Sequence, residues 1–267
     1  MPIVAFTREY GSGATAIAMK AAQGLGYEYI RDQITKEAAE TYGVAEDELI
    51  AVVESKRGFW DSLAEETQVE FALLASEVYR LAEQDNVVIM GRWATLLLRS
   101  IRHCIRVRVC APMETRIPRV MARRSLDRDE AAKLIRKADE GASSRIRQFF
   151  DVQWGDPLLY DLVVNSERVP PDLAVQQILE LARHPEFQPT EDSRAKLRDR
   201  SLEARIRAAF KADRETMRLD LIIVCESGNV ALKGLVFSGG AKEAAEKIAK
   251  SVDGIRSLDN QIRVYRE

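Results

Sequence analysis

Two hydrophobic patterns alternate through the first 185 residues. Short apolar runs at residues 3–6, 27–30, 87–90, 105–110 and 162–164 are separated by longer stretches in which apolar residues recur every three or four positions. Short apolar runs are typical of buried strands, and strands that alternate with helices build parallel sheets. The pattern therefore predicts an α/β fold with a five-stranded parallel sheet and helices on both faces.

The pattern changes after residue 185. Residues 184–192 are polar and contain two prolines, which is typical of a linker between domains. Beyond them the order is a helix, strands at 219–225 and 230–237, a second helix and a strand at 261–265, a small α+β module with the order αββαβ. We therefore expect one domain at 1–185, a linker at 186–196 and a second domain at 197–267.

Charge and cysteine content restrict the function classes. The chain has 40 basic and 42 acidic residues, which argues against a nucleic-acid partner. Residues 194–267 have 16 basic and 11 acidic residues, so this segment is net +5 and the rest is net −7. The three cysteines lack metal-ligand spacing, and no apolar run approaches 18 residues, so we expect buried thiols, no transmembrane segment and a cytoplasmic protein.

The segment TREYGSGATA at residues 7–16 joins the first predicted strand to a helix. A strand, a glycine turn and a helix in this order present backbone N–H groups to an anion. The usual phosphate loop reads G-x-x-x-x-G-K-[ST]. Aligned on Gly13, this loop has Arg8 at the first glycine, Ala14 at the lysine and Thr15 at the hydroxyl that helps to hold Mg²⁺. The phosphate-binding candidates are Gly11, Ser12, Gly13, Ala14 and Thr15.

Arg8 is the candidate replacement for the missing lysine, because a guanidinium can bind phosphate through two nitrogens. Two simpler interpretations stay open: a plain tight turn at residues 11–13, and an ion pair of Arg8 with Glu9 or Asp32.

Other charged residues lie at the predicted edge of the sheet or on one helix. Arg92 follows the third strand, where a ligand would lie, and either binds that ligand or pairs with a carboxylate at a helix start. Asp32 ends the second strand and either orients a ligand or caps a helix, and Arg31 beside it is a further ligand-binding candidate. A helical segment also contains several closely spaced arginines, which either approach the transferred phosphoryl group or form a solvated surface with nearby acids. These candidate catalytic arginines are Arg116, Arg119, Arg123 and Arg124.

Five segments resemble the cytidylate kinase-like family over residues 1–182: TREYGSGATAIA, YEYIRDQI, VVIMGRWATLLL, RVRVCAPMETRIPRVMAR and DPLLYDLVVNSE. The resemblance implies a P-loop kinase fold, ATP and Mg²⁺ as cofactors and a nucleoside monophosphate such as CMP as acceptor. It also implies that Arg31, Asp32 and Arg92 bind the acceptor. Asp139 lies near the family's D-x-x-R stretch, which would place Asp139 and Arg145 at the acceptor, although residue 142 is alanine.

Residues 197–267 resemble a BON domain, with Gly228, Gly234, Gly254 and Asn260 at its characteristic positions. The resemblance implies a regulatory module that binds phospholipid or another ligand. Its net charge of +5 suits either an anionic surface or docking on the front domain, which is net −7. Three functions remain: a phosphotransferase that moves phosphate from ATP to a small acceptor, a catalytically silent nucleotide-binding regulator, and a scaffold that forms a homo-oligomer through the helical region at 33–83. Ala14 and Ala142 favour the silent regulator.

Overall fold

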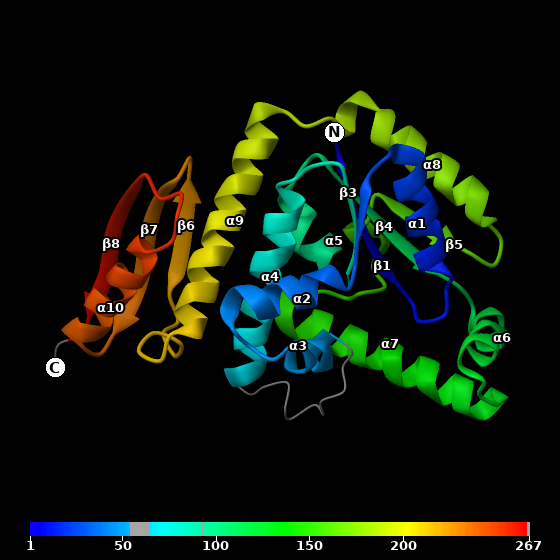
Figure 1. Ribbon diagram of the computed structural model, residues 1–267, viewed down its shortest axis with the longest axis horizontal. Coiled ribbons are helices and arrows are strands. Elements are labelled where there is room, and N and C mark those ends of the chain that lie inside the picture. The colour runs from blue at the N-terminus through cyan, green and yellow to red at the C-terminus, as the bar shows by residue number, and fades with distance from the viewer. Residues whose placement is uncertain (54–64, 92, 266–267) are drawn as a thin grey trace. The chain divides into compact units, whose positions relative to one another are not determined.

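The computed structural model describes residues 1–53, 65–91 and 93–265 (Figure 1). The chain forms two compact units. The first is built mainly from residues 1–33 and 84–190, and the second mainly from residues 34–52, 65–83 and 191–265. The helical region between the second and third strands therefore belongs to the same compact unit as the C-terminal module.

The first unit contains the expected parallel sheet, with strand order β2-β3-β1-β4-β5. All five predicted strands are present. The elements of this unit are β1 (Ile3–Arg8), α1 (Ala14–Leu25), β2 (Glu28–Ile30), β3 (Val87–Met90), α5 (Ala94–Leu97), β4 (Cys104–Cys110), α6 (Met113–Arg124), α7 (Arg128–Phe150), β5 (Leu162–Asn165) and α8 (Pro171–Arg183), with short 3-10 turns at Leu98–Ser100, Pro157–Leu159 and Pro185–Phe187.

Strand β1 is central, and both of its faces are buried. Val4 and Phe6 join a core cluster with Ile17 of α1 and Ile178 of α8, so these two helices cover one face and lie side by side (Figure 1). The alternating β1 residues, such as Ala5, are buried as well. A strand with two buried faces reads as a continuous apolar run, which explains why the sequence pattern located it.

Helices α6 and α7 pack together next to the loop that follows β1. Ile117 and Val120 of α6 form a small apolar cluster with Ile135 of α7, and Tyr10 of the loop packs against this cluster. Helix α7 begins with a capping box in which Asp127 and Glu130 each bind the other's backbone N–H. This packing holds α6 and α7, with their charged residues, against one side of the loop.

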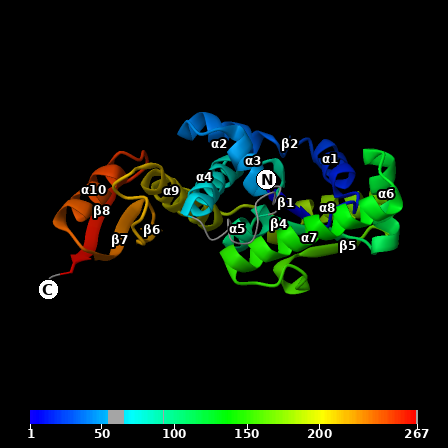
Figure 2. The ribbon, with the colours of Figure 1, turned by 90° about the horizontal axis from the view of Figure 1, so that it is seen from below.

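The second unit combines four helices with a small sheet and a further helix. Its elements are α2 (Gln33–Tyr42), α3 (Glu46–Val53), α4 (Glu65–Ala82), α9 (Glu191–Ala212), β6 (Ile222–Glu226), β7 (Asn229–Val236), α10 (Gly239–Lys250) and β8 (Ser257–Val264). Strand β7 lies between β6, its antiparallel neighbour, and β8, its parallel neighbour (Figure 2). The predicted αββαβ order is confirmed.

Helix α9 contacts α4 as well as β6 and α10. Its residues Leu202, Ile206 and Phe210 belong to the core that covers one face of the small sheet. The helix begins at Glu191, inside the segment expected as a linker. Strand β8 begins at Ser257 rather than at residue 261, because it pairs with β7 along its full length. No helix in the described part of the chain has the length and apolar character needed to cross a membrane.

Candidate phosphate-binding site

The loop between β1 and α1 requires glycine at two positions. Gly11 and Gly13 have φ values of 84° and 81°, in the left-handed region that other residues rarely adopt. At Gly11 there is also no space for a side chain, since an added Cβ would lie 2.8 Å from Cγ2 of Val120 in α6. The two glycines therefore allow the tight turn and the close approach of α6.

The loop leaves several backbone donors available. Within residues 1–53, 65–91 and 93–265, no hydrogen bond engages the backbone N–H of Gly11, Gly13, Ala14 or Thr15. Gly13 is the N-cap of α1, and no side chain caps that helix. Free N–H groups and the positive end of the helix dipole favour an anion at this position.

Residues from α6 and from the end of β5 hold the opposite side of the loop. The Ser12 carbonyl accepts hydrogen bonds from Ser166 Oγ at 2.6 Å and from Arg119 Nη1 at 3.3 Å. Arg119 also donates to Ser166 Oγ and to its carbonyl, both at 3.0 Å. Arg119 thus lies at the loop, bound to Ser12 and Ser166. Sequence reasoning missed Ser166, whose one signal is its position directly after a strand at the carboxyl edge of the sheet.

Asp139 and Arg116 bind the loop and each other. The Tyr10 N–H donates to Asp139 Oδ1 at 2.9 Å, and Arg116 forms an ion pair with the other oxygen of this carboxylate. Arg116 Nη1 also donates to the Tyr10 carbonyl at 3.2 Å, and its Nε lies 3.8 Å from Glu9 Oε2. The structure therefore brings together two residues expected in different roles, one at the acceptor and one in catalysis.

Glu9 is held by a buried arginine of β4. Arg108 Nη2 donates to Glu9 Oε1 at 2.9 Å, and the Ala111 N–H donates to Glu9 Oε2 at 3.1 Å. The Arg108 guanidinium also binds the Trp154 carbonyl and lies 4.9 Å from the centre of the Trp154 ring. The sequence analysis did not single out Arg108, although a charged residue inside an apolar strand is a signal of a buried partner.

Arg8 has no carboxylate partner within the described residues. Of its two expected partners, Glu9 binds Arg108, and Asp32 lies 3.3 Å from Arg31. Burial first, and then the nearby charges of Arg31 and Arg123, lower the pKa of the Arg8 guanidinium. A half-buried cation with cationic neighbours is an arrangement that an anion stabilises.

Two exposed arginines at the end of α6 lie near Tyr10. The Arg123 guanidinium is 5.0 Å from the centre of the Tyr10 ring. Burial acts to raise the pKa of the Tyr10 phenol, but the Arg124 hydrogen bond and the charges of Arg123 and Arg124 outweigh it and lower this pKa. Both arginines add positive charge beside the loop, close to Arg8 and Tyr10.

Two of the acceptor candidates do not lie at the surface of the loop in the described chain. Arg145 is buried in α7, as is Ala142, and Arg92 lies outside the described residues.

Thr15 is the candidate ligand of a metal ion, and it is half-buried in the first turn of α1. The described ranges contain no group of three or more His, Cys, Asp or Glu residues suited to a metal ion. The Thr15 hydroxyl lies beside the free N–H groups of the loop, and a hydroxyl oxygen is a donor of the chemical type that Mg²⁺ prefers.

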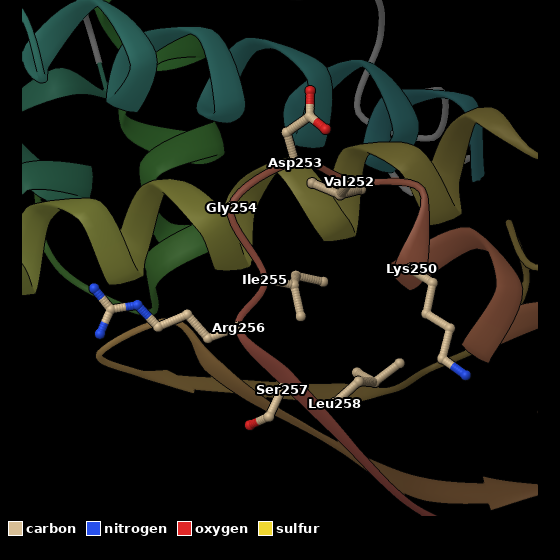
Figure 3. A pocket seen from close by; sticks show the side chains of 8 residues that line it. All are labelled: Lys250, Val252, Asp253, Gly254, Ile255, Arg256, Ser257 and Leu258. Atoms are coloured by element: carbon tan, nitrogen blue, oxygen red, sulfur yellow. The ribbon is translucent and has the colours of Figure 1, made fainter.

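A separate cavity of about 340 Å³ lies in the second unit, along residues 250–258 (Figure 3). Ile255 lies at its centre, whereas the charged ends of Lys250, Asp253 and Arg256 point in different directions. Small-molecule sites combine an apolar lining with polar groups that converge on the ligand. This cavity lacks that convergence, so the loop after β1 is the stronger candidate site.

Comparison with known proteins supports the same assignment. The family model described as "Cytidylate kinase-like family" matches residues 3–168, and the BON domain model matches residues 198–265. Cytidylate kinases of Methanocaldococcus jannaschii and Thermoplasma acidophilum are both 27% identical to the chain, over 161 and 186 residues. These matches cover 59% and 67% of this chain, and 84% and 93% of the relatives. A crystal structure of an uncharacterized protein from Eubacterium ventriosum has a TM-score of 0.54 and 22% identity, over 68% of this chain and 98% of that one, which shows a shared fold. The chain therefore belongs to the cytidylate kinase-like family and has a C-terminal BON domain.

Proposed function

We propose that the protein transfers a phosphoryl group from ATP to a nucleoside monophosphate such as CMP. The observation that supports this most is Arg8, a half-buried guanidinium without a carboxylate partner in the described chain, beside a loop with four free backbone N–H groups. The relatives described as cytidylate kinases indicate the acceptor class.

In this proposal each residue acts through position and charge. The N–H groups of residues 11–15 hold the donor phosphates, and Arg8 supplies the charge of the missing lysine. Arg119, Arg123 and Arg124 stabilise charge that develops on the transferred group, since phosphoryl transfer depends mainly on positioning and electrostatics. Bound Mg²⁺ would neutralise phosphate charge, and Thr15 would be its protein ligand.

The acceptor side depends on the end of β2 and on α7. Arg31 and Asp32 follow β2 directly, and Arg31 lies close enough to Arg8 to affect its pKa. We assign Arg31, Asp32, Arg92 and Arg145 to the acceptor, and the BON domain to regulation. Asp139 and Arg116 hold the loop in place through their contacts with Tyr10.

A catalytically silent nucleotide-binding regulator is the second candidate. It is favoured by Ala14 at the lysine position and by the buried Ala142. It is also favoured by the pairing of Asp139 with Arg116, which engages two charged groups before any substrate binds. Both candidates require nucleotide binding at the same loop.

The test is ADP release from ATP and Mg²⁺ across a panel of nucleoside monophosphates, with calorimetric ATP binding measured in parallel. Turnover that Arg8→Ala lowers by about 10² or more supports the phosphotransferase. Arg102→Ala is the matched control, because Arg102 is exposed and pairs with Glu186 in the same unit. ATP binding without ADP release supports the regulator, and no ATP binding by the wild-type protein contradicts both.

A further inference from the structure

One face of the small sheet in the second unit is apolar and exposed. The residues facing the core are Ile223, Cys225, Val230, Leu232, Val236 and Ile262, and they pack under α9 and α10. The residues that alternate with them form the opposite face, which we call the outer face. Its apolar members are Ile222, Val224, Ala231, Leu235, Phe237 and Tyr265.

Strand register makes the outer face continuous. Val224 pairs with Ala231 across β6 and β7, and the Phe237 and Tyr265 rings lie 6.1 Å apart in an edge-on arrangement. Phe237 is 85% exposed and Leu235 is 55% exposed. Neighbouring rows on one side of a sheet lie within side-chain reach, so these residues form one surface rather than isolated apolar positions.

The area of the outer face is close to the area that one partner contributes to a protein–protein interface. Aromatic side chains contribute roughly 150–250 Å² each, so two partly exposed rings with three exposed aliphatic residues give about 600 Å². The largest apolar patch of a typical monomer is about 300–600 Å², and a stable interface buries about 800 Å² per partner. With its polar residues included, the outer face reaches the area that one side of a dimer needs.

The charges on the outer face favour a partner with the same surface. Lys233 and Arg263 contribute two positive charges, while Glu226 and Asp259 contribute two negative charges. The face is therefore neutral overall, which gives no general attraction to a nucleic acid or an anionic lipid surface. Lys233 lies in the middle strand, between the row of Val224 and Ala231 and the row of Leu235. Apolar residues therefore alternate with charges of both signs on this face, and a second copy of the same face can offer an opposite charge to each of them.

We propose that the protein forms a homodimer in which the outer faces of two copies pack against each other. Sheets that pack face to face in this way form the two layers of a sandwich. The contact would bury Phe237 and Leu235, which lie at the end of β7. This inference is independent of the proposed phosphotransfer, because every residue of the outer face lies beyond β5 and α8, in the second unit.

The test is sedimentation equilibrium of the full chain over a range of concentrations. We expect a monomer–dimer equilibrium that Phe237→Glu weakens by about thirtyfold or more, the loss typical of an aromatic residue that carries much of the binding energy of an interface. The matched control is Leu158→Glu. Leu158 is also 85% exposed, but it lies in the first unit, so its change should leave the dimer intact.

Two further measurements separate the alternatives. Far-UV circular dichroism and thermal unfolding should show that the Phe237→Glu variant is folded, and Leu235→Lys offers a second variant of the same face. A wild-type protein that is monomeric at all concentrations overturns the proposal. Co-sedimentation with anionic vesicles that Phe237→Glu abolishes, without a dimer in solution, also overturns it and assigns the outer face to a membrane.

Discussion

Removing the charge of Arg8 should raise the stability of the ligand-free protein and weaken its binding of an anion. The pKa of Arg8 is lowered, first by burial and then by Arg31 and Arg123, so the folded protein disfavours the charged form. Arginine stays charged throughout the neutral pH range, and therefore its charge lowers the stability of the ligand-free protein at every such pH. Replacing Arg8 with methionine removes the charge and keeps most of the apolar stem.

The expected gain follows from the burial of the Arg8 charge and from the like charges near it, and the like charges set its scale. Two unit charges about 10 Å apart interact by about 1–2 kcal/mol at an effective dielectric constant of 20. We therefore expect Arg8→Met to raise the free energy of unfolding of the ligand-free protein by about 1–2 kcal/mol. This corresponds to an increase in Tm of about 2–4 °C per kcal/mol for a unit of this size.

Phosphate should reverse the order of the two proteins. An anion that binds the loop at a hundred times its Kd stabilises the wild type by about 2.7 kcal/mol, and Arg8→Met should lose most of this effect. Differential scanning calorimetry with and without phosphate or Mg-ATP measures both changes, and Arg102→Met is the control. A variant that is less stable than the wild type without ligand, yet equally stabilised by phosphate, would refute the reasoning.

Three further changes test the loop and the second unit. Gly11→Ala should lower stability by about 1–3 kcal/mol in urea unfolding, because its Cβ would lie 2.8 Å from Val120 and its φ of 84° is unfavourable. Asp139→Ala should cost about 3 kcal/mol or more and weaken ATP binding in calorimetry, because it leaves Arg116 with one carboxylate at 3.8 Å; unchanged stability would contradict the role of the pair. Asp199 of α9 accepts hydrogen bonds from two turn N–H groups between β6 and β7, at 2.9 and 3.1 Å. Burial opposes the shift, but these bonds lower the pKa of Asp199, so its contribution is complete above about pH 4 and is lost as pH falls through the folded-state pKa. Unfolding profiles of the wild type and Asp199→Asn should therefore converge at low pH, and a constant difference would contradict this.

Local sequence patterns were enough to locate the strands of the parallel sheet, the order of elements in the second module and the loop after β1. Each of these depends on local information: a strand buried on both faces is a continuous apolar run, and a left-handed turn requires glycine. The loop pattern identified Arg8 as a candidate, and the close spacing of arginines on one predicted helix identified Arg119. Arg119 contacts the loop, and Arg8 is the last residue of the strand that precedes it. The start of the last strand was predicted wrongly, at residue 261. Strand β8 begins at Ser257, because its first residues pair with β7.

Which acid pairs with which arginine depends on how distant segments of the chain pack together. Glu9 is next to Arg8 in the chain, yet its partner is Arg108, 99 residues away, and this choice leaves Arg8 without a carboxylate in the described chain. The assignment of residues 34–52 and 65–83 to the second unit has the same origin, because α4 packs on α9. Periodicity records whether a residue is buried, but the identity of its neighbours depends on how distant segments pack together.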